Sequence, residues 1–202
     1  FSLKGIDEIE ILREKYFDDI KNQKDIKSKY QKIRKKYQKN NLINFEVCFY
    51  DIFKKKGGFD IVIANPPYEV LEGKDYKQEI NRIKSIDIFE KACEGKVNYF
   101  KVFLLKSNCI LNKNGVLTFI FQNSFLGTKN CTKLRELCFK ENKVIKITSY
   151  PERDNPNTRV FKSAKMSVCI LEMSKKHYLN YDFSIEVNND KNKNSGFELT
   201  LN

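Results

Sequence analysis

The chain has 202 residues, of which 41% are hydrophobic, and this length allows one ordinary folded domain with a real core. Its net charge of +12 favours a polyanionic partner, most simply nucleic acid. The six cysteines form no Cys-x-x-Cys pair and His177 is the only histidine, so we expect no metal site and no disulfide framework. No apolar run is of membrane-spanning length and no signal peptide is present, so we expect no membrane segment and a cytoplasmic location.

Residues 1–43 are predicted to form a basic helical insertion. Asp7 and Glu10 are spaced like a capping box at a helix start. Residues 20–40 then carry nine positive side chains and one negative, which is +8, or two thirds of the net charge. Such a run fits a solvated helix face, and it also fits an arm that lies along a phosphate backbone. Because the chain begins at Phe1 rather than Met, we expect it to be a piece of a longer protein.

The segment that follows predicts two strands. Residues 44–50 alternate loosely and predict a strand that ends at Asp51. Phe59–Ala64 is a near-continuous run of apolar residues, which predicts a central strand buried on both faces of a parallel sheet. Pro66 and Pro67 then end this strand, because neither can donate to a ladder, and the chain leaves the sheet as a rigid loop. Open α/β sheets bind their ligands at this carboxyl end of the strands.

The residues of this loop have the chemistry to bind a planar base with an amino group. Asn65 precedes a proline, so its backbone is extended and its amide is expected to point out of the sheet. Its side-chain oxygen and the Pro66 carbonyl can accept hydrogen bonds from one exocyclic amine, while the ring of Tyr68 offers a flat stacking face.

The rest of the chain predicts an α/β fold. Residues 69–95 are expected to be a polar loop with a helical segment near residues 86–93, and residues 112–115 are expected to be a turn. Helices are predicted over residues 99–111 and 133–140, and strands over residues 116–121, 144–148 and 166–173. The alternation predicts a doubly wound, mostly parallel sheet. Residues 175–202 are polar and predict a linker toward a further domain.

The loop Asn65-Pro66-Pro67-Tyr68 after a hydrophobic strand resembles the catalytic motif of amino-methyltransferases that depend on S-adenosylmethionine. Motifs in order over residues 44–173 are similar to those of TaqI-like gamma-class N6-adenine DNA methyltransferases, as found in type IIG restriction–modification enzymes. The resemblance implies a partial Rossmann-like, class I methyltransferase fold. It also implies that residues 44–174 are the carboxyl-side part of a catalytic domain.

The resemblance assigns a role to each site residue. Asn65, Pro66 and Pro67 would form the catalytic loop that binds the target amine, and Tyr68 would stack on an adenine flipped out of double-stranded DNA. Phe161, in the Val160-Phe161 motif, would contact the same base.

For the cofactor S-adenosylmethionine, the resemblance implies that Asp51 accepts a hydrogen bond from the adenine amine, with Ile52 in place of the usual aromatic residue. Phe103, in Asn98-Tyr99-Phe100-Lys101-Val102-Phe103, would pack against that adenine. From the residues alone, Asp51 suits a turn cap and Phe103 suits the core. Asn123-Ser124-Phe125-Leu126 would be scaffold.

Several family features are absent from the chain. Residues 1–43 contain no glycine-rich cofactor loop, and no target-recognition or nuclease domain follows. We therefore expect weak or absent cofactor binding and no activity from this piece alone. A missing first strand would also leave an apolar edge at Phe59–Ala64 that favours self-association.

The function that this predicts is methylation of the N6 amine of adenine in DNA as part of a restriction–modification system. Release-factor glutamine methyltransferases and some RNA methyltransferases carry the same Asn-Pro-Pro-Tyr loop, so protein or RNA substrates stay open. A catalytically silent nucleic-acid-binding module is the third alternative.

Overall fold

The computed structural model describes residues 28, 32, 45–176, 178–190 and 193–201, so the predicted basic insertion of residues 1–43 lies almost entirely outside the described residues. The chain divides into two compact units, Phe1–Gly58 and Phe59–Asn202. No helix in the described ranges combines the length and apolar character that crossing a membrane requires.

The described part of the first unit is helical, so the strand predicted over residues 44–50 is wrong. Helix α3 spans Phe45–Cys48 and α4 spans Tyr50–Lys56. The rings of Phe45 and Phe49 stack with centroids 6.1 Å apart, the i, i+4 spacing of a helix, and this aromatic spacing overrides the apparent alternation. The αL conformation of Gly57, with φ 73°, ends α4, and its N–H donates to the Phe53 carbonyl.

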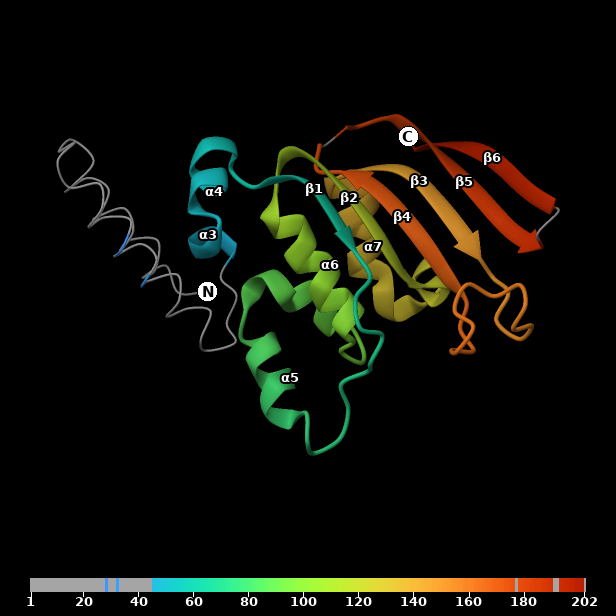
Figure 1. Cartoon of the computed structure of the whole chain (residues 1–202), viewed down its shortest axis with the longest axis horizontal. Helices are drawn as coiled ribbons and strands as arrows, with labels where there is room; N and C mark the ends of the chain where they lie inside the picture. Colours follow the sequence, from blue (N-terminus) through green and yellow to red (C-terminus); the bar gives the residue numbers. More distant parts are fainter. Residues whose placement is uncertain (1–27, 29–31, 33–44, 177, 191–192, 202) are drawn as a thin grey trace. The chain divides into compact units, whose positions relative to one another are not determined.

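The second unit is built on a six-stranded sheet in the order β1-β2-β4-β3-β5-β6 (Figure 1). The strands are β1 Phe59–Ala64, β2 Leu111–Gln122, β3 Lys143–Tyr150, β4 Val168–Ser174, β5 Tyr181–Asp190 and β6 Lys193–Leu201. The pairs β1–β2 and β3–β5 are parallel, and the other three pairs are antiparallel. Four strands thus share one direction while β4 and β6 oppose it, which confirms the α/β class in a mixed sheet.

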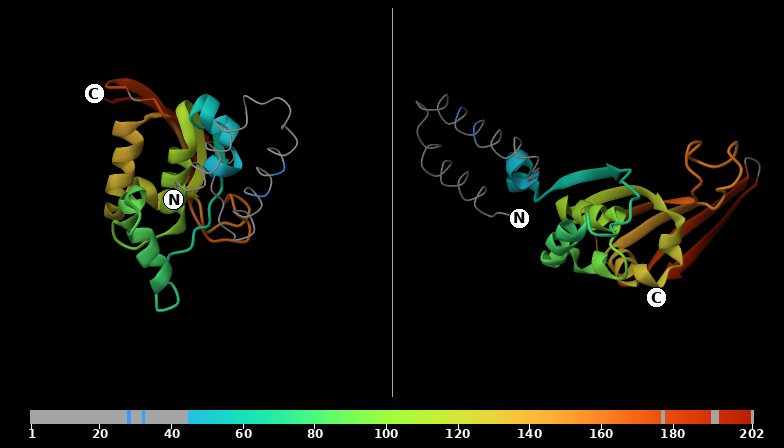
Figure 2. Two further views of the ribbon diagram at one scale, coloured as in Figure 1. Left: turned by 90° about the vertical axis from the view of Figure 1, so that its left-hand side faces the viewer. Right: turned by 90° about the horizontal axis from the view of Figure 1, so that it is seen from below.

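Within the described residues of the second unit, helices cover one face of this sheet, so the expected doubly wound arrangement is not present in that unit. Helix α6 spans Tyr99–Ile110, and α7 spans Thr132–Glu136 and continues as a π-helical turn over Leu137–Glu141. Figure 2 shows both helices on the same side of the sheet. The face they cover carries the fully buried core, which includes Leu117, Phe119, Phe121, Leu171 and Met173.

Strand β1 is an edge strand of the described sheet, which corrects the prediction of a central strand buried on both faces. Val62 packs against the core, but Ile61 is 65% exposed and Ile63 is 78% exposed. An apolar run alone does not reveal whether a second layer covers the strand. Gly115 permits close pairing with β2, because a Cβ there would come within 2.8 Å of the Phe59 carbonyl oxygen. Residues 112–115, which the sequence predicts as a turn, are instead part of β2.

Two further segments are more regular than predicted. Within residues 69–95, α5 spans Lys77–Lys84 and the 3-10 helix η2 spans Asp87–Cys93, which confirms the expected helical segment and adds α5. The linker predicted over residues 175–202 instead contains β5 and β6. Its alternating Tyr181, Phe183 and Ile185 pack toward the core, a period-two pattern that the many polar residues between them conceal.

Candidate active site

The Asn65–Tyr68 loop begins where the β1–β2 ladder ends. Ala64 lies opposite Phe119 in the last register pair, and Pro66, which has no N–H, cannot extend the ladder. The hydroxyl of Tyr68 donates across this gap to the Ile120 carbonyl at 3.2 Å. Asn65 is exposed and Pro66 is buried, so the Asn65 side chain is accessible at the carboxyl end of the strand.

The Tyr68 hydroxyl contacts both the loop and the sheet. Besides the Ile120 carbonyl, it lies 2.9 Å from Oδ1 of Asn65. Burial, reinforced by the Cys169 thiol, raises the pKa of Tyr68 to about 12, so the hydroxyl keeps its proton at neutral pH. One proton serves one acceptor at a time, so the hydroxyl can move its bond between Asn65 and Ile120.

The start of α6 positions the other side of the loop. Asn98 is the N-cap of α6: its Oδ1 accepts from the Phe100 N–H at 3.1 Å, and its Nδ2 donates to the Tyr68 carbonyl at 3.2 Å. The Tyr99 N–H donates to the Glu69 carbonyl at 3.1 Å. Asn98 is 4% exposed and was not among the predicted site residues, although its N-cap position before an apolar helix is a sequence signal.

Phe161 joins this loop from a distant part of the chain. It lies in the segment 151–167, which connects β3 to β4, and its ring centroid is 6.1 Å from that of Tyr68, with the planes tilted by 57°. A base sandwiched between parallel rings needs about 7 Å, or roughly 3.5 Å on each side. The 6.1 Å separation is therefore too short for a base to lie between the two rings in parallel stacking.

The residues predicted to bind the cofactor, Asp51, Ile52 and Phe103, lie on helices and not on the Asn65–Tyr68 loop. Phe103 is on α6 and is 43% exposed, whereas its neighbours Phe100 and Leu104 are buried. The core interpretation of Phe103 is therefore wrong, and its ring is accessible to a ligand. Asp51 and Ile52 lie in α4, in the first compact unit, so Asp51 does not follow a strand.

The scaffold beneath the loop is held by a buried lysine. Lys101, in the first turn of α6, is 3% exposed, and its Nζ donates to the carbonyls of Glu94 at 2.7 Å, Lys96 at 3.1 Å and Asn130 at 2.7 Å. Burial lowers the pKa of Lys101 despite the opposing charge of Glu94. The lysine thereby joins α6, whose N-cap Asn98 bonds to the Tyr68 carbonyl, to the segment before α6 and to the segment before α7.

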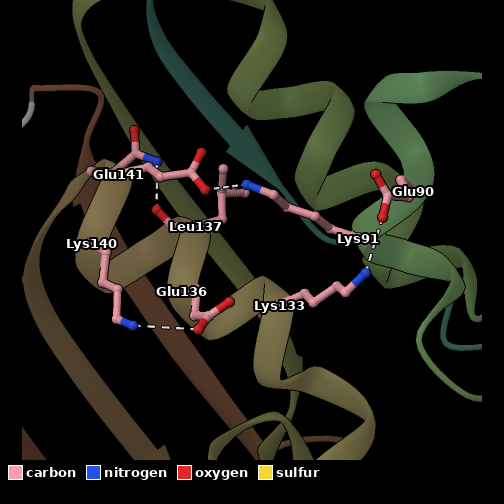
Figure 3. A network of polar contacts seen from close by, with 8 residues as sticks. Glu90, Lys91, Lys133, Glu136, Leu137, Lys140 and Glu141 are labelled. Atoms are coloured by element: carbon pink, nitrogen blue, oxygen red, sulfur yellow. Dashed lines mark hydrogen bonds and ion pairs between the residues drawn. The ribbon is translucent and has the colours of Figure 1, made fainter.

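Surface ion pairs reinforce the same scaffold (Figure 3). Lys133 contacts Glu90 at 3.0 Å, and Lys91 contacts Glu141, so η2 is joined to α7 and to the turn after it. Exposed pairs of this kind stabilise by at most about 1 kcal/mol each. Phe125, in the Asn123–Leu126 turn, is fully buried against Phe121 and serves as scaffold, as predicted.

The chemistry that the loop offers is hydrogen-bond acceptance beside an aromatic face. The acceptors are Asn65 Oδ1 and the Pro66 carbonyl, and the aromatic faces are those of Tyr68 and Phe161. No group of three or more His, Cys, Asp or Glu side chains in the described part of the chain is arranged to hold a metal ion.

Comparisons with known proteins cover most of the chain. A family model described as Eco57I restriction-modification methylase matches residues 3–155. The type II methyltransferases M.HincII and M.HindII of Haemophilus influenzae are each 30% identical over 120 residues, which is 59% of this chain and 23% and 22% of theirs. The methyltransferase subunit of a type I restriction-modification system from Streptococcus thermophilus aligns with a TM-score of 0.46 and 19% identity, over 68% of this chain and 28% of that chain. The chain thus spans about a quarter of the length of the curated relatives it matches.

Proposed function

Because the chain belongs to the Eco57I restriction-modification methylase family, we propose that it carries the target-amine part of a site that methylates the N6 amine of adenine in double-stranded DNA. The narrower class, TaqI-like gamma enzymes of type IIG, is part of this proposal. The observation that supports it best is the pairing of Tyr68 with Phe161 beside the Asn65 acceptor. Two aromatic rings suit a planar base better than they suit a flexible glutamine side chain.

The proposed role of the loop is to make a poor nucleophile reactive. The lone pair of the adenine amine is delocalised into the ring, which keeps the nitrogen planar. Asn65 Oδ1 and the Pro66 carbonyl would each accept a hydrogen bond from one N–H of the amine and favour the tetrahedral geometry that attack on a methyl carbon requires. Extruding the base costs a few kcal/mol, and stacking on Tyr68 with a contact from Phe161 would offset that cost.

The chain fits its expected cofactor in part. S-adenosylmethionine, when bound, supplies a methyl group activated by a sulfonium. The exposed ring of Phe103 suits packing against the adenine of the cofactor. We include contacts from Asp51 and Ile52 to the adenine of the cofactor in the proposal. The weak or absent cofactor binding expected of this chain alone stays a prediction.

The test is labelled methyl transfer by the full-length protein that contains this chain. Duplex DNA, RNA and release factor are offered as substrates, and the labelled product is analysed as nucleosides or amino acids. Label in N6-methyladenine of DNA supports the proposal. Label confined to RNA or to glutamine would retain the chemistry of Asn65–Tyr68 and reject the DNA substrate.

A further inference from the structure

The loop of residues 151–167 carries more than Phe161 to the candidate site. Figure 1 shows this loop beyond the ends of β3 and β4, and the ring pair of Phe161 and Tyr68 joins it to the loop that follows β1. Its charged residues are two acids, Glu152 and Asp154, and four bases, Arg153, Arg159, Lys162 and Lys165. The loop is thus basic beside the proposed target base.

Both acids of the loop are engaged within it. Glu152 accepts from the backbone N–H of Asp154 at 2.7 Å and of Asn155 at 3.0 Å. Asp154 pairs with Lys165 at 2.9 Å and lies 3.7 Å from Nε of Arg153. These bonds lower the pKa of both carboxyl groups, so both are ionised at neutral pH and both are bound by groups of the loop itself.

Three of the four bases are also used by the loop itself. Lys165 and Arg153 face Asp154. The Arg159 guanidinium folds back onto the loop, donating to the Arg153 carbonyl at 3.4 Å and to the Lys162 carbonyl. Lys162 differs from these three, because its side chain is exposed and has no hydrogen-bond or ion-pair partner within the described ranges. Its backbone is nevertheless held in place by Arg159.

We propose that the Lys162 ammonium binds a backbone phosphate of DNA next to the extruded base, an inference that rests on the proposed function. Lys162 directly follows Phe161 in the chain, so an exposed lysine is anchored next to the residue whose ring would contact that base. A lysine on a four-carbon stem is a flexible point charge suited to phosphate. A phosphate contact positions the nucleotide without reading its sequence.

The test compares the salt dependence of duplex binding by full-length wild type, Lys162→Ala, Lys162→Arg and a control, Lys113→Ala. Lys113 is an exposed lysine near the start of β2, nine residues before Gln122, and thus roughly 30 Å from the site end of the same strand. Loss of one phosphate contact reduces the slope of log K against log salt by about 0.9. We expect that reduction for Lys162→Ala alone, on duplexes of any sequence.

A second measurement locates the phosphate. Once the methylated adenine has been mapped, neutral methylphosphonates replace single phosphates around it. We expect one position at which the replacement weakens binding by wild type but not by Lys162→Ala. An unchanged slope in Lys162→Ala, with methyl transfer to DNA retained, overturns the phosphate contact and leaves the proposed function standing. Absence of both DNA binding and DNA methylation in wild type overturns both.

Discussion

The Tyr68 hydroxyl donates to Oδ1 of Asn65 at 2.9 Å, the oxygen proposed to bind the target amine. The Ile120 carbonyl, 3.2 Å from the same hydroxyl, is a second acceptor. An arriving amine can therefore take the Asn65 oxygen while Tyr68 transfers its bond to Ile120. The exchange leaves no polar group unpaired, so releasing Asn65 for its substrate costs little free energy.

Replacing Asn65 tests the amine acceptor. We expect Asn65→Ala to reduce kcat by about 10²–10³-fold, the cost of losing one hydrogen-bonding group aimed at the reacting centre. DNA affinity is expected to change little, because the aromatic rings remain. Asn114→Ala, an exposed asparagine near the start of β2, is the control. Equal losses of methyl transfer and DNA affinity in Asn65→Ala would contradict this role.

Substitutions of Tyr68 separate the hydroxyl from the ring. Tyr68→Phe keeps the stacking face but leaves the Ile120 carbonyl without its donor, so we expect a loss of about 1 kcal/mol, or roughly fivefold in kcat. Tyr68→Ala also removes stacking, which adds about 1–3 kcal/mol. Steady-state kcat and KM for DNA distinguish the two variants. Equal defects in both would mean that the ring has no role in stacking.

Asn98 is expected to affect both stability and catalysis. Asn98→Ala removes the N-cap of α6 and the donor to the Tyr68 carbonyl, and we expect a loss of about 1–2 kcal/mol in unfolding free energy. Asn98→Ser retains a good N-cap but is too short to preserve the bond to Tyr68. Denaturant unfolding should show Asn98→Ser near wild type, while kcat falls in both variants. A normal kcat in Asn98→Ser would make Asn98 a structural cap only.

Lys101 predicts a pH-dependent contribution to stability. Lys101→Met leaves three carbonyls without their shared donor, so we expect a loss of about 3 kcal/mol in unfolding free energy at pH 7. Burial lowers the pKa of Lys101 in the folded state, so between that pKa and its ordinary value of 10.5 the unfolded state binds more protons. The contribution of Lys101 to unfolding free energy should therefore rise with pH across this window.

The matching experiment is denaturant unfolding of wild type and Lys101→Met at several pH values from 7 to the ordinary lysine pKa. The difference between the two proteins isolates Lys101 from other titrating groups. A difference that shrinks as pH rises would mean that the folded state favours the charged amine, opposite to the expected direction.

The exposed face of β1 predicts self-association. Ile61 and Ile63 form an apolar surface on an edge strand of the described sheet, and such edges promote pairing between chains. We expect Ile63→Lys to reduce self-association of this chain in sedimentation velocity, with a change of only about 0.5 kcal/mol in stability because the side chain is already exposed. Ile145→Lys, on the interior strand β3, is the control. A monodisperse wild-type monomer at all concentrations would reject the prediction.

Local signals in the sequence were sufficient for the elements that carry the candidate site. The apolar run Phe59–Ala64 formed β1, the paired prolines ended it, and the stretch after Asn98 formed α6. Each of these outcomes depends on neighbouring residues only: a β-branched run, a missing N–H or a capping side chain. The acceptors of Asn65 and Pro66 and the ring of Tyr68 could therefore be assigned to one loop before any fold was known.

The sequence by itself determined the α/β class, the loop after β1 and the chemistry of that loop. Tertiary structure alone decided that β4 pairs between β2 and β3 in the opposite direction, that the rings of Phe161 and Tyr68 are tilted by 57° with centroids 6.1 Å apart, and that Lys101 is buried on three carbonyls. The physical reason is that strand pairing and burial depend on contacts between residues distant in the chain, which no local pattern of side chains specifies.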